Sequence, residues 1–261
     1  MSLDRELEIG NGWQILSLER QKLEALAAQN LAPNSIHIYE TLPSTNQTLW
    51  ELIKEGITPG SVVIAAQQTA GRGQRGHQWY SAIGGLYLSY ALAPNIPVSQ
   101  SFQLTLRTAW GIAIALKTLG IPVQLKWLND LVIDRRKLGG ILTETKVNKG
   151  IITQAVVGVG INWANPVPET GINLNSFIDT IPCLEMLAAV TIQGIEKGIN
   201  APIANLILAY EQLLINIGQS VTVGDRTGII IGITNTCCLR LQVEDGSEIH
   251  LKPGSISLGY K

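Results

Sequence analysis

The sequence contains few charged residues, few aromatic residues and few cysteines, and it has no long apolar run. Charged residues make up 15% of the 261 residues, against roughly 25% in an average soluble chain. The hydrophobic share of 46% with a formal net charge of −1 excludes a disordered chain, which needs low hydrophobicity and high net charge. The near-neutral charge also argues against a dedicated nucleic-acid-binding protein, because phosphate contacts require a basic surface.

The apolar runs and the cysteines predict where the protein works. The longest apolar run, residues 109–116, is far shorter than the ~20 residues that a helix needs to cross a bilayer. The N-terminus alternates acidic and basic residues and lacks the layout of a signal peptide. The three cysteines, Cys183, Cys237 and Cys238, are an odd number with two of them adjacent, which argues against a disulfide framework. Their spacing is also not that of metal ligands. We therefore predict a cytoplasmic protein with reduced thiols, without a structural metal and without a membrane partner.

The small net charge hides an uneven distribution. Residues 68–137 carry eight basic side chains against two acidic ones, Asp130 and Asp134, whereas residues 1–67 and 138–261 are both acidic overall. A cationic middle segment predicts an anionic ligand. The alternative is a solvated positive surface.

Hydrophobic periodicity predicts helices and strands along the whole chain. Ser44 and Gln47 form a candidate capping box, and Asp245-Gly246 is a candidate hairpin turn. Helices are expected near 17–28, 45–56, 106–114, 184–195 and 203–217. Strands are expected at 62–66, 86–92, 123–127, 131–133, 138–143 and 151–161, with several short strands after residue 218.

A glycine-rich loop, Gly71 to Gly76, matches the pattern G-x-G-x-x-G. A dinucleotide site would need a helix opening at this loop and an acidic residue about 20 positions later. The chain instead continues into His77-Gln78-Trp79, and the loop holds two arginines. We interpret it as a flap with backbone freedom, cations for a phosphate or carboxylate, and Trp79 as an apolar wall. An ordinary glycine-rich connection is the alternative.

Two later segments also carry polar groups on predicted strands. If residues 123–144 pair as strands, Lys126, Asp130 and Lys137 meet at one end of a sheet. Two lysines would offset developing negative charge, and the carboxylate would take a proton from an incoming amine; a surface salt-bridge cluster is the alternative. The third segment, 157–163, has glycines that permit close approach and ends with Asn162 as a polar contact.

In this order, the three segments resemble those of the biotin–protein ligases, over about residues 38–163, and Ser44-Thr45-Asn46 and Gln68 also match the family pattern. The resemblance implies an α+β fold, with a class II synthetase-like catalytic domain built on a mixed sheet with flanking helices. We place this domain at residues 1–218 and a small C-terminal SH3-like β-barrel at 219–261. The resemblance also implies a homodimer, with 151–161 as a candidate edge strand for pairing.

The implied activity has two steps. Biotin reacts with ATP, assisted by Mg²⁺, to give biotinyl-AMP, and the biotinyl group passes to a lysine of the biotin carboxyl carrier domain of acetyl-CoA carboxylase. Lys137 would stabilise charge during adenylation, Asp130 would position or deprotonate the incoming lysine, and Arg72 would be the third catalytic side chain. The implied biotin-binding residues are Ser44, Thr45, Asn46, Gln68, Gly71, Arg72, Gly73, Gln74, Trp79, Lys137 and Gly140. The implied ATP- or adenylate-binding residues are Arg72, Arg75, Trp79, Lys126, Asn129, Asp130, Lys137 and Asn162.

The sequence also departs from the family pattern. Gln74 replaces a loop arginine, and His77-Gln78 replaces an arginine–lysine pair, so we expect weaker retention of biotinyl-AMP. About 37 residues precede the first match, which we expect to be too few for the DNA-binding domain that some members carry. A lipoate or octanoate ligase on the same scaffold and a non-catalytic biotin sensor remain alternatives.

Overall fold

The computed structural model describes residues 6–8, 13–15, 23, 33–256 and 258–259. Its helices are α2 (Thr45–Lys54), α3 (Ser101–Thr118), α4 (Leu184–Asn200) and α5 (Ile203–Glu211). Its strands are β1 (Glu6–Glu8), β2 (Trp13–Ile15), β3 (Ser35–Leu42), β4 (Ser61–Gln68), β5 (Gly85–Leu92), β6 (Ile96–Pro97), β7 (Gln124–Lys126), β8 (Asp130–Ile133), β9 (Arg136–Asn148), β10 (Ile151–Asn162), β11 (Ser220–Val223), β12 (Arg226–Ile233), β13 (Leu239–Val243) and β14 (Glu248–Leu251). None of the described helices combines the length and the apolar character that a membrane crossing requires.

An eight-stranded mixed sheet forms the centre of the molecule. Its strand order is β3-β4-β5-β10-β9-β8-β7, and β6 joins it by pairing with β10. β3 and β4 run parallel, and the other neighbouring pairs are antiparallel. The predicted mixed sheet is therefore confirmed.

The expectation that residues 151–161 form an edge strand is wrong. These residues lie in β10, which is hydrogen-bonded to β5 on one side and to β9 on the other. Most residues of this segment are apolar and buried, as expected for a strand in the interior of a sheet that is covered on both faces. Within the described ranges the edges of the sheet are β3 and β7.

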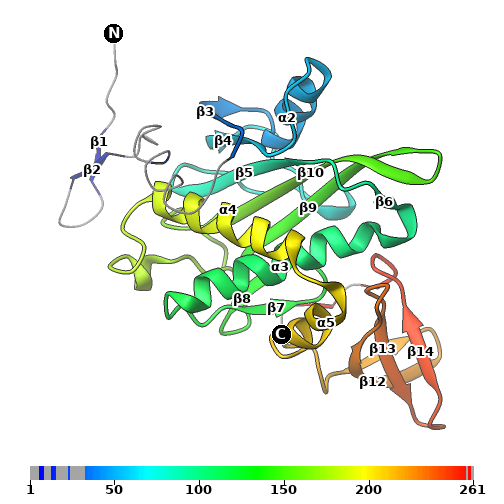
Figure 1. Cartoon of the computed structure of the whole chain (residues 1–261). Helices are drawn as coiled ribbons and strands as arrows, with labels where there is room; N and C mark the ends of the chain where they lie inside the picture. Colours follow the sequence, from blue (N-terminus) through cyan, green and yellow to red (C-terminus); the bar gives the residue numbers. More distant parts are fainter. Residues whose placement is uncertain (1–5, 9–12, 16–22, 24–32, 257, 260–261) are drawn as a thin grey trace.

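Alternation along the strands gives the sheet two different faces. On one face, Val157 and Val159 of β10 belong to the main hydrophobic core, which includes residues of α3 and α4. On the other face, Val156 belongs to a smaller cluster with Leu49 of α2. Figure 1 shows α3 and α4 lying side by side across the sheet, and α2 next to β3 and β4. The flanking helices that we predicted are thus present, and α2 is the one described helix whose residues belong to the cluster on the second face.

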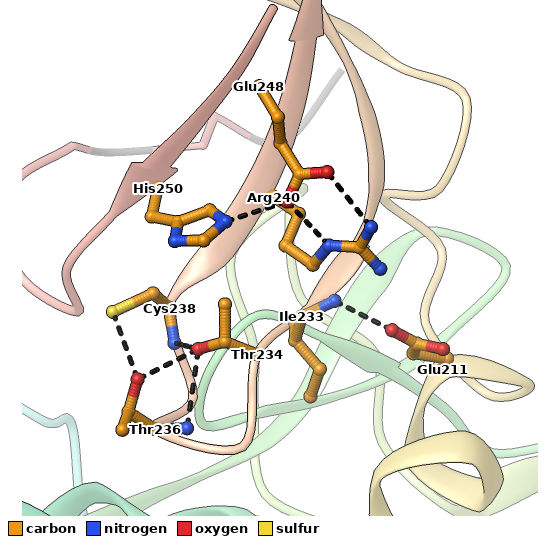
Figure 2. Close-up of polar contacts among 8 residues, drawn as sticks. All are labelled: Glu211, Ile233, Thr234, Thr236, Cys238, Arg240, Glu248 and His250. Carbon is orange, nitrogen blue, oxygen red and sulfur yellow. Dashed lines mark hydrogen bonds and ion pairs between the residues drawn. The ribbon is translucent and has the colours of Figure 1, made fainter.

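The four strands β11 to β14 form a separate antiparallel sheet, at one end of the molecule next to α5 (Figure 1). This sheet fits the small C-terminal β unit that we predicted. Figure 2 shows how it is tied to its surroundings: Glu211 of α5 accepts a 2.7 Å hydrogen bond from the backbone N–H of Ile233. On the sheet itself, Arg240 donates two hydrogen bonds to Glu248, and His250 Nε2 lies 2.6 Å from the same carboxylate. The hydrogen bonds from Arg240 and His250 lower the pKa of Glu248 to about 2.

Three local predictions need correction or fall outside the described residues. The capping box is not formed: within the described part, Ser44 makes no side-chain cap hydrogen bond, and Gln47 donates instead to Glu51 along the helix. The helix expected over 203–217 ends at Glu211, because the following residues turn back so that Leu214 forms a β-bridge with Leu125. The helix expected near 17–28 lies outside the described residues, apart from a buried Leu23.

Candidate functional site

A cavity of about 560 Å³ lies on the face of the sheet that α2 partly covers. Its floor contains Gly158 and Gly160 of β10, which alternate with the core residues Val157 and Val159. A Cβ on Gly160 would stand 2.5 Å from the indole nitrogen of Trp79. The glycines therefore leave space over the sheet that larger side chains would fill.

The strand register places one row of residues across this floor. Gly160 lies opposite Gly140 of β9, Gly140 lies opposite Asp130 of β8, and Asp130 lies opposite Lys126 of β7. Residues directly opposite one another in a sheet point to the same face. The row therefore leads from an open glycine floor to a charged end.

Lys126, Asp130 and Lys137 meet at this charged end. Asp130 lies 2.7 Å from Lys137 and 3.6 Å from Lys126. The side chains of Lys126 and Asp130 are only 8% and 11% exposed, whereas Lys137 is 29% exposed, so the cluster is not the surface ion pair that the sequence left open. Burial lowers the pKa of Lys126, and the nearby Lys137 lowers it further, while Asp130 acts in the opposite direction.

A β-bulge brings Lys137 into this cluster. The register between β8 and β9 shifts between Leu131 and Val132, so that Val132 lies opposite Lys137 and Leu131 opposite Gly139. In a regular strand, residues 137 and 140 would point to opposite faces. The extra residue, Leu138, is fully buried in the core, and Lys137 joins Gly140 on the cavity side.

Asn162 holds the backbone of Lys137 through a hydrogen bond. Its amide donates hydrogen bonds to the backbone oxygens of Lys137, at 3.3 Å, and of Ile172, at 3.2 Å. Asn165 donates to the Asn162 side-chain oxygen at 3.0 Å. Asn162 is buried and is not among the lining residues of the described cavity, so in this structure it contacts the backbone of Lys137 and not the cavity itself.

The opposite end of the cavity is polar and uncharged. The Gln68 side-chain oxygen accepts a 2.8 Å hydrogen bond from the backbone N–H of Thr45, and its amide donates to Ser81 at 2.8 Å. The Ser89 hydroxyl lies 2.8 Å from the Thr45 hydroxyl and 2.6 Å from the Asn46 side-chain oxygen. These connected groups are suited to hold the polar head of a small uncharged ligand.

The glycine-rich loop folds back as a hairpin over the cavity. Trp79 donates its backbone N–H to the oxygen of Gly71 at 3.0 Å, and Gly73 donates to His77 at 2.7 Å. A Cβ on Gly71 would meet Trp79 and Ser81, so this glycine permits a close backbone approach. Trp79 packs over Gly160, and its indole N–H is buried without a hydrogen-bond partner among the described residues.

All the predicted site residues except Gly71 and Asn162 line this one cavity in the described structure. They are Ser44, Thr45, Asn46, Gln68, Arg72, Gly73, Gln74, Arg75, Trp79, Lys126, Asn129, Asp130, Lys137 and Gly140. Arg72 also forms a 3.1 Å ion pair with Glu144. Asn129 donates its amide to the backbone oxygen of Ile141 at 3.1 Å.

Several residues of the site were missed by the sequence analysis. Ser89 belongs to an ordinary apolar strand pattern, so no local signal marks its hydroxyl. Phe102 and parts of the segment 253–259 also line the cavity, and Arg75 donates a hydrogen bond to the backbone oxygen of Ile256. The approach of this C-terminal segment depends on tertiary packing.

The cavity has little capacity to bind a metal by protein groups alone. Asp130 is the only carboxylate among its described lining residues. Within the described ranges, no cluster of three or more His, Cys, Asp or Glu side chains is placed to bind a metal ion. A divalent cation at this site would therefore bind chiefly through the oxygens of a ligand.

Comparison with known proteins places the chain in a family. The profile of the Biotin/lipoate A/B protein ligase family matches residues 38–162. The bifunctional ligase/repressor BirA of Escherichia coli is 31% identical over 280 residues, which cover 98% of this chain and 80% of that protein. BirA of Bacillus subtilis is 36% identical over 126 residues, 48% of this chain, and the match spans only 39% of that protein's length.

A solved structure agrees with this result. The biotin protein ligase from Aquifex aeolicus, in complex with biotin and ATP, has a TM-score of 0.67 and 25% identity, and the match covers 87% of this chain and 99% of that chain. The residues that carry the predicted motifs lie within the segment that the family profile matches. The chain therefore belongs to the biotin/lipoate A/B protein ligase family, where it is similar to the bifunctional ligase/repressor of Escherichia coli and to the biotin protein ligase of Aquifex aeolicus.

Proposed function

We propose that this protein is an ATP-dependent biotin–protein ligase. The observation that carries the proposal is the cavity itself, which joins an uncharged polar end at Thr45 and Gln68 to a cationic end at Lys126 and Lys137. Biotin has an uncharged polar ring system and a carboxylate at the end of an apolar chain. The cavity offers matching chemistry at each end and an open glycine floor between them.

In the first step, an oxygen of the biotin carboxylate bonds to the α-phosphorus of ATP, and the bond from that phosphorus to pyrophosphate breaks. Lys137 lies at the cationic end, where negative charge develops, and its ammonium stabilises that charge. Lys126 supports it from a more buried position. Mg²⁺, bound with the nucleotide, would neutralise phosphate oxygens, as hard cations do.

In the second step, the neutral amine of an acceptor lysine attacks the acyl carbon, AMP leaves and the amine loses a proton. Asp130 is the carboxylate available at this end of the cavity, and we assign it the positioning or deprotonation of the amine. Asn162 holds the backbone of Lys137 and so positions the cation. Gln74 is exposed at the hairpin tip and carries no charge, which supports our expectation that biotinyl-AMP is retained less well than in relatives with an arginine there.

We further propose the biotin carboxyl carrier domain of acetyl-CoA carboxylase as the acceptor, a homodimer as the assembly and the cytoplasm as the location. The location is supported by the three cysteines, all of which are free thiols. We divide the chain at residue 218, where Gly218 with a φ of +80° precedes β11. The predicted absence of nucleic-acid binding stays a prediction.

Transfer of labelled biotin to a purified carrier domain, with ATP and Mg²⁺, tests the proposal. We expect the Lys137→Ala variant to lose adenylation and to keep its fold, whereas Arg136→Ala, an exposed neighbour, retains activity. Exchange of pyrophosphate with ATP in the presence of biotin, lipoate or octanoate identifies the acid that is activated. Exchange with lipoate or octanoate alone would contradict the proposal, and biotin binding without exchange would favour a sensor.

A further inference from the structure

Glu144 of β9 connects three segments that are distant in the sequence. Its Oε1 lies 3.1 Å from the guanidinium of Arg72 in the glycine-rich hairpin. Its Oε2 accepts a 2.9 Å hydrogen bond from the indole N–H of Trp50 in α2. The ammonium of Lys146 lies 4.7 Å from the centroid of the Trp50 ring. The two oxygens of the carboxylate therefore have different partners. The hydrogen bond from Trp50 orients the side chain of Glu144 independently of its ion pair with Arg72.

Arg72 lies in the part of the hairpin that lines the cavity. It forms a β-bridge with Gln78, the residue directly before Trp79. Trp79 in turn packs over Gly160 on the floor. An ion pair that holds Arg72 in place therefore also holds the part of the hairpin that covers the cavity.

Arg72 and Glu144 also share a second hollow, of about 400 Å³, beside the main cavity. It is lined by Gln47, Trp50, Glu51, Lys54, Arg72 and Glu144. Arg72 lines both hollows, so its ion pair stands at the boundary between them. The positive charge of Arg72 and the negative charge of Glu144 offset each other at this boundary. The Glu144 carboxylate therefore does not repel an anionic ligand in the main cavity.

We propose that Glu144, oriented by Trp50, is a positioning residue that anchors the glycine-rich hairpin through Arg72 and thereby sets how long the cavity retains the acyl-adenylate. The acyl-adenylate part of this inference rests on the proposed function. The anchoring part concerns the hairpin alone. The ion pair is partly exposed, at 49% for Arg72 and 26% for Glu144, so the effect of removing it is moderate.

The decisive variant is Glu144→Gln, which removes the charge that pairs with Arg72 and keeps an oxygen that can accept from Trp50. We expect preformed biotinyl-AMP to dissociate about two- to fivefold faster, as for the loss of one partly exposed ion pair, with KM for biotin raised and kcat little changed. The matched control is Glu51→Gln, which lies in the same hollow and contacts Gln47. It is expected to behave as the unaltered protein.

A double-mutant cycle separates anchoring from a general loss of structure. In an Arg72→Met background, Glu144→Gln should have no further effect on the dissociation rate. Trp50→Phe, which removes only the indole donor, should speed dissociation by less than Glu144→Gln does. A wild-type dissociation rate in Glu144→Gln, or an equal effect of this substitution with and without Arg72, would overturn the proposal.

Hydrogen exchange provides a readout that requires no ligand. The backbone N–H groups of Gly73 and Trp79 are bonded within the hairpin, and we expect both to exchange faster in Glu144→Gln than in Glu51→Gln. Faster exchange in a protein that forms no biotinyl-AMP would support the anchor and contradict the proposed function. Unchanged exchange in a protein that does form biotinyl-AMP would contradict the anchor and leave the proposed function supported.

Discussion

We predict that loss of the Asp130 carboxylate destabilises the folded chain. It lies 2.7 Å from the ammonium of Lys137 and 3.6 Å from that of Lys126. With an effective dielectric constant of about 20, unit charges at these separations attract by about 6 and about 5 kcal/mol. Most of this attraction is offset by the loss of hydration of the buried charges.

The Asp130→Asn variant keeps the shape of the side chain and removes its charge, which leaves the buried Lys126 without this carboxylate. Removing one member of a buried ion pair destabilises a protein by about 3–5 kcal/mol. Because Lys137 is 29% exposed and solvent reaches it, we expect the lower end, about 3 kcal/mol. Asp134→Asn in the exposed turn between β8 and β9 is the control, and it should change stability by less than about 0.5 kcal/mol.

The change of the stability deficit with pH is a second, independent test of this prediction. Burial already lowers the pKa of Lys126, and Asp130 opposes that effect, so the variant lowers this pKa further. Between the lowered pKa and the unfolded value of about 10.4, the folded chain binds fewer protons than the unfolded chain, and stability therefore rises with pH. The stability deficit of Asp130→Asn should shrink as the pH is raised from neutral toward 10.

Urea unfolding followed by tryptophan fluorescence, at neutral pH and at about pH 9.5, measures both effects. A variant as stable as the unaltered protein at neutral pH would show that the cluster is hydrated and that the burial argument is wrong. A deficit of the same size at both values would show that Lys126 is not the group responsible.

Three further predictions follow from the packing and the charges. Gly160→Ala places a Cβ 2.5 Å from the indole nitrogen of Trp79, so we expect calorimetry to show weakened biotin binding while the unfolding temperature changes little. Gly194→Ala places a Cβ 2.7 Å from a backbone atom of α3, and urea unfolding should show a loss of about 1–3 kcal/mol from overpacking. The lowered pKa of Glu248, about 2, should appear in an NMR titration. The stability from this carboxylate is present above its unfolded pKa and is lost as the pH falls through about 2, and Arg240→Gln should raise the pKa.

Much of the fold could be predicted because helices and strands leave a local record in the sequence. Apolar residues at helical spacing predicted α3 and α4, and the apolar residues of 151–161 predicted the strand β10. The hairpin at Asp245-Gly246 depends on two adjacent residues and is confirmed, with Gly246 at a φ of +80°. The short motifs could be recognised for the same reason, since their spacing is contiguous along the chain.

Long-range pairing was decided by the tertiary structure. The single extra residue that turns Lys137 toward Asp130 is a property of the register between β8 and β9, and the periodicity of one strand does not record it. In the sequence, nothing distinguishes Glu144 from other polar residues of a strand. Its role becomes visible only in the folded protein, where it contacts Trp50 of α2 and Arg72 of the glycine-rich hairpin. The sequence by itself determined which side chains are candidates for the chemistry, because residue type and local spacing can be read from it. Their convergence on one cavity depended on pairings between strands far apart along the chain, which only the folded protein establishes.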